Sequence, residues 1–427
     1  MRHKQFFCLF LVTVLLLSSL CMSLSSCQME EGGSSDVQTL YVYNWGEYIS
    51  DGSEGTDDVN QLFEQYYFEK YGKRVKVNYS TFSSNEDMYA KVSSGSASYD
   101  VIVPSDYMIQ RMVKEDLLEP LNPYMHLIPN YANVSDAFKG ENVYYEDDTK
   151  NIYSIPYFYG MIGIIYNTQK VDENDEQLGS WALMWDEDYK RDILQFNNSR
   201  DAFGTALYYL GYDVNNATDE QWREALELLK KQKPLLQGYV MDEIFNKMQG
   251  GSAAVAAYYA GDFLSMYENN EDLAFYYPQE GTNIYVDAMC VPKNARNKEL
   301  AMEYINFMCA DAVTIGDSEY NIGESNALYT YYASPLTTVV ESESYQEEMG
   351  DEAMDILYGM AEDVEAQPYL NLDDDGLIRL NDLWEELKVE SSVGVGIYIA
   401  CGAIVAALVL LVVYLILKKR RWAKLYD

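Results

Sequence analysis

The segments TLYVYNW (residues 39–45) and DVNQLFEQYYFEKYG (residues 58–72) decide the fold class, because they indicate a strand followed by an amphipathic helix that ends at Gly72. The same alternation then occurs twice more. VKVNYSTF (75–82) precedes EDMYAKVSSG (86–95), and YDVIVPS (99–105) precedes DYMIQRMVKEDLL (106–118). Strands that alternate with helices in this way predict an α/β fold with a mainly parallel sheet.

The rest of the chain carries similar signals at less regular intervals. Strands are expected in IYSIPYFYGMIGIIYNT (152–168) and NIYVDAMCVP (283–292), and SAAVAAYYAGDFLSMY (252–267) indicates a strand that leads into a helix. Without its two unusual ends the chain has about 365 residues, which suits two domains. The other expected helices are ALYYLGY (206–212), DEQWREALELLKKQKP (219–234), NKELAMEYINFMCA (297–310), DEAMDILYGMAEDVEAQ (351–367) and LIRLNDLWEELK (377–388).

The first 27 residues have the pattern of an export signal. Arg2, His3 and Lys4 precede an apolar run, and small residues lead to Cys27. The tetrapeptide LSSC (24–27) resembles a bacterial lipobox, which predicts a lipidated Cys27; cleavage by an ordinary signal peptidase is the alternative. Residues 28–37 are polar and are expected to form a linker.

The C-terminal end predicts a membrane anchor. Residues 393–417 carry no charge, and 25 helical residues span roughly 37 Å, enough to cross a bilayer. A basic cluster follows within residues 418–427, so these residues are expected to form a short cytoplasmic tail. The rest of the chain is then expected on the extracellular or periplasmic face of the cell membrane.

The composition excludes several classes of function. A formal net charge of −38 makes nucleic acid an implausible partner and favours cations. Outside the export signal His126 is the one histidine, which argues against His-rich zinc sites and His-dependent catalytic triads. Cys290 and Cys309 lie in apolar runs and are expected to be buried free thiols.

Aromatic and acidic residues gather where the expected strands end. Ligands of open parallel sheets bind beyond the carboxyl ends of the strands. We therefore expect five segments to face one cleft. They are Trp45 to Tyr48, Ser105 to Tyr107, Asn198 to Asp201, Tyr259 to Asp262 and Tyr285 to Asp287.

A series of motifs gives the chain a family resemblance. In order, they are YNWGEYI (43–49), TFSSNEDMYAKVSSGSASYDVIVPSDYMIQRMVKEDLLEPL (81–121), YSIPYFYG (153–160), YYAGDF (258–263) and YVDAMCVPKNARNKELAMEYINFM (285–308). With their spacing, they resemble the spermidine/putrescine-binding receptors of ABC importers over residues 38–388. The resemblance implies a two-lobed α/β fold like that of type II periplasmic binding proteins, with a hinge. With the C-terminal transmembrane helix added, this is the expected fold class.

The resemblance also implies where the lobes lie and what the protein does. Lobe 1 is expected to comprise residues 38–154 and 288–325, and lobe 2 residues 155–287 and 326–388. The implied function is that of a membrane-tethered receptor without enzymatic activity. It would bind a polyamine, putrescine or spermidine, between the lobes and deliver it to the permease of an ABC importer. The resemblance implies no cofactor and no metal.

Eleven ligand-binding residues follow from the resemblance. The implied aromatic box consists of Trp45, Tyr48, Tyr107, Tyr259 and Tyr285. Ser105 matches a serine that lines the cleft of the relatives, and Asp287 matches an acid that takes an amine. The remaining implied contacts are Glu47, Asn198, Asp201 and Asp262.

The chemistry of a polyamine fits these residue types. Flat rings suit the methylene chain and attract ammonium groups, at about 0.5–2 kcal/mol per desolvated contact. Carboxylates fix the ammonium groups through charge-assisted hydrogen bonds. Asn198 stands where spermidine-preferring relatives tend to have an aspartate, and this difference favours a shorter diamine.

Two alternative interpretations rest on the same residue types. Aromatic rings and paired carboxylates would also suit an extracellular carbohydrate-active hydrolase or a sugar-binding protein. Asn371 to Asp382 spaces its oxygens partly as a calcium loop does, although it begins with Asn and ends with Asp. A solvated acidic start of the last helix is the other interpretation of that segment.

Overall fold

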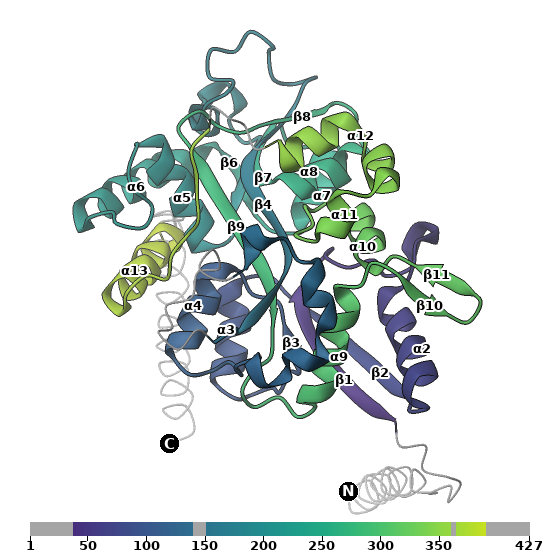
Figure 1. Cartoon of the computed structure of the whole chain (residues 1–427). Helices are drawn as coiled ribbons and strands as arrows, with labels where there is room; N and C mark the ends of the chain where they lie inside the picture. The colour runs from purple at the N-terminus through teal and green to yellow at the C-terminus, as the bar shows by residue number, and fades with distance from the viewer. Residues whose placement is uncertain (1–36, 140–150, 360–363, 390–427) are drawn as a thin grey trace, which may run out of the picture. The chain divides into compact units, whose positions relative to one another are not determined.

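Two groups of strands and helices, which we call lobe 1 and lobe 2, are joined by two long strands (Figure 1). The computed structural model describes residues 37–139, 151–359 and 364–389. The joining strands are β4 (Ser154–Asn167) and β9 (Thr282–Cys290), which pair antiparallel along most of their length. The two-lobed α/β fold expected from the sequence is therefore confirmed. The exact lobe boundaries stay a prediction.

Lobe 1 contains the strand–helix alternation from which the fold class was predicted. Asp58 caps the first long helix by accepting a hydrogen bond from the backbone N–H of Gln61, and the helix ends at Gly72 in the left-handed conformation, with φ 65°. The elements of lobe 1 are β1 (Gln38–Trp45), α2 (Val59–Tyr71), β2 (Val75–Phe82), α3 (Asn85–Ser93), β3 (Val101–Ile102), α4 (Asp106–Lys114), α9 (Lys298–Met308), β10 (Val313–Ile315) and β11 (Ser318–Tyr320).

Lobe 2 contains the central part of the chain and the last helices. Its second long helix begins with a capping box formed by Thr218 and Gln221. Its elements are β5 (Ile193–Phe196), α5 (Ser199–Tyr209), α6 (Asp219–Gln232), β6 (Leu236–Val240), α7 (Glu243–Gln249), β7 (Val255–Tyr259), α8 (Ala260–Tyr267), β8 (Leu273–Tyr276), α11 (Thr337–Val340), α12 (Glu343–Tyr358), β12 (Ala366–Gln367) and α13 (Asp374–Val389).

Short helices complete the structure. Helix α10 (Ile322–Thr330) contacts α2 and α9 of lobe 1 as well as α8 and α12 of lobe 2. The 3-10 helices are η1 (Ser53–Gly55), η2 (Asn122–Leu127), η3 (Pro129–Asn133), η4 (Asp136–Phe138), η6 (Trp181–Trp185), η7 (Glu187–Tyr189) and η8 (Lys233–Leu235).

The sheet is mixed, which corrects the expectation of a mainly parallel one. Its main path runs β2-β1-β3-β9-β4-β7-β5-β6. Parallel pairs lie on either side, β1 with β3 and β5 with both β6 and β7. The central pairs β3–β9, β9–β4 and β4–β7 are antiparallel, because β4 and β9 run in opposite directions between the lobes. The segment 152–168 forms one long strand instead of several.

A third crossing comes from the C-terminal segment. β12 pairs with the beginning of β9, and the backbone N–H of Asn371 then donates a hydrogen bond to Gln110 on helix α4 of lobe 1. Helix α13 returns to lobe 2, where it packs against α5 and α6. The chain therefore links the lobes at several points around their junction.

The membrane anchor included in the expected fold class has to be corrected. Within the part of the chain that the structure describes, no helix combines the length and apolarity that a bilayer crossing requires. Residues 393–417 and the tail 418–427 lie outside the described residues, as do the export signal 1–27 with Cys27 and nearly all of the linker 28–37. The fold class that the described residues show is the two-lobed α/β fold.

Candidate functional site

A pocket between the lobes contains ten of the eleven residues expected to bind ligand; we call it the interlobe pocket. Its empty volume is about 710 Å³, including the open solvent at its mouth. The ten residues are Trp45, Tyr48, Ser105, Tyr107, Asn198, Asp201, Tyr259, Asp262, Tyr285 and Asp287. Four of the five segments lie where a strand ends or just beyond it, whereas Tyr285 and Asp287 lie within β9.

Asp287 is held in place by side chains from lobe 1. The hydroxyl of Tyr48 donates a 2.8 Å hydrogen bond to one carboxylate oxygen, and Ser105 Oγ donates a 2.6 Å bond to the other. Asn85 orients Ser105 in turn, through bonds of 3.0 Å to Oγ and 3.1 Å from the backbone N–H. The carboxylate therefore has a fixed orientation in the pocket wall.

Burial governs the ionisation of Asp287, which is 5% exposed. Loss of hydration raises the pKa of its carboxyl to about 7, although the hydrogen bonds from Ser105 and Tyr48 act in the opposite direction. Near neutral pH the group is thus balanced between its two protonation states. A bound cation would favour the ionised form.

Asp201 is the corresponding carboxylate in lobe 2. It lies in the first turn of α5, whose N-cap is Asn198. Asn198 Nδ2 donates a 2.7 Å bond and the Tyr259 hydroxyl a 2.8 Å bond to the same oxygen, Oδ2 of Asp201. Burial raises the pKa of Asp201, and these two donors oppose that effect. Asn198 therefore serves to position an acid of the pocket.

Asp262 lies in the first turn of α8 and is 7% exposed. Burial raises the pKa of its carboxyl to about 8, against the effect of a hydrogen bond from Tyr332. The nearby charges of Asp242 and Glu47 raise it further. These acids therefore disfavour one another's ionisation as long as no cation lies among them.

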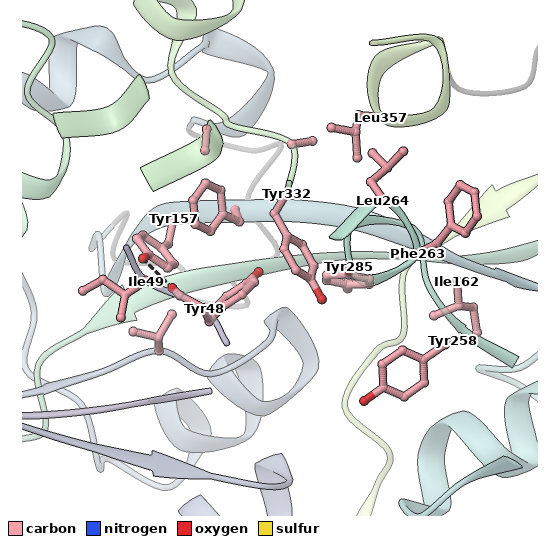
Figure 2. Close-up of a cluster of buried hydrophobic side chains, with 14 of the residues drawn as sticks. Tyr48, Ile49, Tyr157, Ile162, Tyr258, Phe263, Leu264, Tyr285, Tyr332 and Leu357 are labelled. Atoms are coloured by element: carbon pink, nitrogen blue, oxygen red, sulfur yellow. Dashed lines mark hydrogen bonds between the residues drawn. The ribbon is translucent and has the colours of Figure 1, made fainter. Parts of the chain in front are cut away.

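Tyrosine rings form the apolar walls of the pocket. Tyr259 and Tyr285 meet edge to face, with ring centroids 5.4 Å apart, and Tyr48 and Tyr332 do so at 4.6 Å. Figure 2 shows the Tyr48 and Tyr332 rings next to each other and the hydrogen bond from the Tyr157 hydroxyl to the Tyr48 backbone. Packed rings of this kind are rigid, so they offer a preformed surface to a methylene chain.

Glu47 is the expected ligand residue that the structure does not place in the interlobe pocket. Its backbone lies in the left-handed region, with φ 48°. The side chain lines two adjoining cavities instead. Burial raises the pKa of Glu47, and the charges of Asp242 and Asp51 add to the effect. The acid therefore lies beside the pocket, not in its wall.

The pocket also contains acids that were not among the eleven expected ligand residues. Burial raises the pKa of Asp106 to about 8 although two backbone N–H groups, of Tyr107 and Val286, bond its oxygens. Glu86, whose pKa is also raised by burial, accepts a 3.0 Å bond from the Tyr107 hydroxyl. Asp106 lies inside the segment Ser105 to Tyr107 that was expected to face the cleft, although it was not named as a ligand residue.

Asp242, Tyr332 and Tyr369 were missed for different reasons. Asp242 follows the end of strand β6 and could have been found by the strand-end rule that located the other loops. Tyr332 and Tyr369 come from the segments after α10 and β12, which carry no local signal of a pocket. Only the return of the C-terminal part of the chain to the lobe junction brings them there.

The charge balance of the pocket is one-sided. Its described lining includes six carboxyl groups and no Lys, Arg or His. The buried Arg200 lies behind the wall, with its guanidinium carbon 4.5 Å from the centroid of the Tyr369 ring. Its donors are directed to the backbone oxygens of Val214 and Leu370 and to Asn215. The pocket therefore presents acidic groups among aromatic rings, with no basic side chain in its described lining.

The segment considered as a calcium loop begins a helix. Helix α13 starts at Asp374, and Asp373 Oδ1 accepts a 2.7 Å hydrogen bond from the backbone N–H of Gly376. The described residues also contain no group of three or more His, Cys, Asp or Glu side chains placed to hold a metal ion. The start of α13 at Asp374 and the hydrogen bond to Asp373 favour the acidic helix start. Cys290 and Cys309 are buried free thiols, as expected.

A two-lobed α/β fold with a pocket between its lobes defines a class, that of the solute-binding proteins. Residues 61–347 match the family of bacterial extracellular solute-binding proteins, and the chain belongs to this family. It is therefore a binding protein and not an enzyme, as predicted. The carbohydrate-active hydrolase considered as an alternative is not supported.

A sequence relative and two solved structures show which members of this family the chain is similar to. The chain is 30% identical, over 76% of its length and 90% of the relative, to the spermidine/putrescine-binding periplasmic protein of Salmonella typhimurium. A solved Listeria monocytogenes structure described as a spermidine/putrescine ABC transporter is similar with a TM-score of 0.69 and 32% identity, over 82% of this chain and 99% of that one. The spermidine/putrescine ABC transporter substrate-binding protein PotD of Streptococcus pneumoniae is similar with a TM-score of 0.62, 32% identity and the same coverage.

Proposed function

We propose that this protein is an extracellular receptor that binds a polyamine, putrescine or spermidine, in the interlobe pocket and delivers it to the permease of an ABC importer. The observation that carries the proposal is the lining of the pocket, with six carboxyl groups among tyrosine rings and no basic side chain in its described part. The names of the similar proteins, which bind spermidine and putrescine or belong to ABC transporters, support the same ligand class.

The pocket offers both parts of a polyamine a suitable partner. Asp287 and Asp201, each held by two side-chain donors, would accept charge-assisted hydrogen bonds from ammonium groups. The Tyr259 and Tyr285 rings would contact the methylene chain between them. A neutral sugar would leave these buried carboxylates without a countercharge, which is unfavourable.

Ligand binding would favour lobe closure. The walls come from both lobes, so a bound polyamine contacts both and stabilises the arrangement in which they lie together. Strands β4 and β9 and the segment before α13 are the chain crossings that would bend. The closed form would then be the one recognised by the permease.

Lipidation of Cys27 belongs to the same proposal, because a surface anchor would keep the receptor near its permease. The support is the LSSC tetrapeptide at residues 24–27. Labelling with a radioactive fatty acid would be lost in a Cys27→Ala variant if the cysteine is the acceptor. Label that persists in this variant would count against the assignment.

Isothermal titration calorimetry tests the proposed ligand class. The purified protein is titrated with putrescine, spermidine and, as neutral controls, glucose and maltose. We expect a polyamine to bind with a Kd of about 1 μM or below, which corresponds to about −8 kcal/mol, and the sugars to give no measurable heat. Binding of a sugar, or of no amine at all, would refute the proposed function.

A further inference from the structure

Asp242 lies where the interlobe pocket meets two neighbouring cavities. One of these, the outer cleft, is lined by Glu47, Glu243 and Glu268 among others, and the second is a groove along α2 and β2. Asp242 lines all three cavities, and within the described residues it is the one that does. A ligand that extends from the pocket into either cavity is therefore able to approach its carboxylate.

The Asp242 carboxylate reaches across the junction between the lobes. It belongs to lobe 2, just after β6, yet it packs against Gly46, which follows β1 in lobe 1. A Cβ atom on Gly46 would lie 2.5 Å from Asp242 Oδ2, closer than real Cβ contacts come. The glycine therefore leaves the space that this carboxylate occupies, beside the Trp45 wall of the pocket.

Asp242 differs from the two deep carboxylates in its partners. Asp287 and Asp201 each receive hydrogen bonds from two side chains. In the described ranges, Asp242 receives no side-chain hydrogen bond and forms no ion pair, and its side chain does not cap α7. Asp242 is exposed at the mouth of the pocket, so its carboxylate is free to accept hydrogen bonds from a cationic group that lies there.

We infer that Asp242 binds an additional ammonium group of the ligand at the mouth of the pocket and so selects a triamine over a diamine. This inference rests on the polyamine-binding function proposed above. Asp287 and Asp201 would take two ammonium groups in the interior, and the third would lie at the mouth beside Asp242. The neutral Asn198, which favours a diamine, is thereby offset by an acid from a different segment of the chain.

Three ligands separate the charge of the third amine from the length of the chain. Calorimetry at pH 8 compares putrescine, spermidine and N1-acetylspermidine, which keeps the spermidine skeleton but carries two positive charges. We expect the wild-type protein to bind spermidine at least tenfold more tightly than the other two. Equal affinity for spermidine and its acetylated form would overturn the inference, although a receptor that binds all three would still satisfy the proposed function.

Two variants test the position and the charge of Asp242 separately. Asp242→Asn should weaken spermidine binding at least tenfold and putrescine binding less than threefold. Gly46→Ala changes no charge but displaces the carboxylate, so it should reduce spermidine affinity in the same selective way. If both variants weakened all three ligands equally, or none of them, Asp242 would not be the selecting residue.

Two further variants serve as controls. Glu268→Gln removes a charge from the exposed lining of the outer cleft and should change no affinity by more than twofold. Asp287→Asn should weaken every amine, since it acts on the interior of the pocket. A loss of spermidine selectivity in Glu268→Gln as large as in Asp242→Asn would assign the effect to the general field of the cleft and overturn the inference.

Discussion

Replacement of Asp287 by asparagine is the most direct test of how the pocket recognises a cation. The substitution removes the negative charge and keeps the shape. The amide oxygen still accepts one hydrogen bond, and the hydroxyl groups of Ser105 and Tyr48 are able to rotate so that one of them accepts from the new N–H. The change therefore isolates the charge of one carboxylate.

The expected loss of affinity follows from the hydrogen bond to the ammonium group. A hydrogen bond to a charged group contributes about 1.5–3 kcal/mol, and 1.4 kcal/mol corresponds to a factor of ten. Asp287→Asn should therefore weaken binding about 10- to 150-fold. Because burial raises the pKa of Asp287 to about 7, the comparison is made at pH 8, where about nine tenths of the wild-type carboxyl is ionised.

Titration calorimetry with putrescine gives the two affinities, and thermal unfolding checks the fold. In the empty protein a carboxyl with a raised pKa holds its proton more tightly when folded, so the contribution of Asp287 to stability falls as the pH rises from about 4 to about 7. Asp287→Asn lacks this contribution, and its melting temperature at pH 8 should equal or exceed that of the wild type.

The exposed Asp188 supplies the control for Asp287→Asn. Asp188→Asn removes the same charge from the surface and should leave putrescine affinity within twofold of the wild type. If Asp287→Asn bound putrescine within threefold of the wild type at pH 8, the assigned contact would be refuted. An equal loss in both variants would refute it as well, since the effect would then come from net charge.

Other consequences concern pH, hydroxyl groups and thiols. Ligand binding requires ionised Asp287, whose pKa is about 7, so the polyamine affinity of the wild type should rise about tenfold from pH 6 to pH 8. Proton release on binding should appear in calorimetry as binding heats that depend on the buffer. An affinity independent of pH would contradict this reasoning. Tyr48→Phe removes a hydrogen-bond donor to the Asp287 carboxylate, so the rise of polyamine affinity with pH should occur at a higher pH than in the wild type. An unchanged pH dependence would show that this hydrogen bond does not influence the pKa of Asp287. Tyr285→Phe removes a buried hydroxyl that lacks a partner within the described structure, so unfolding free energy should stay equal or rise by about 1 kcal/mol, and a clear decrease would contradict the reasoning. Cys290 and Cys309 are free, so a reductant should leave the melting temperature unchanged, and a decrease would reveal a disulfide.

Most of the secondary structure was predictable because it depends on local patterns. Periodicity located α2 (Val59–Tyr71) and α6 (Asp219–Gln232), and Gly72 marked the end of the first of them. Strand direction was less predictable. The pattern of β4 and β9 shows that they are strands, but their antiparallel pairing depends on the path between the lobes.

Some residues of the candidate site were likewise predictable from local motifs, and others were not. Trp45, Ser105 and Asp287 were expected because they lie in motifs that resemble those of known receptors, and the structure brings them to one pocket. Glu47 belongs to such a motif too, but the left-handed turn at this residue accompanies its placement beside the pocket. Tyr369 enters the pocket through a chain crossing that no nearby sequence pattern reports.

The sequence by itself determined the class of elements, the acidic and aromatic character of the protein and the segments that carry its motifs, because these properties depend on residues close together in the chain. The tertiary structure decided which carboxylates lack a partner. Tyr48 bonds Asp287 across 239 positions, and Asp242 packs against Gly46 of the other lobe. Such pairings depend on how the two lobes meet, since desolvation and charge are set by neighbours in space.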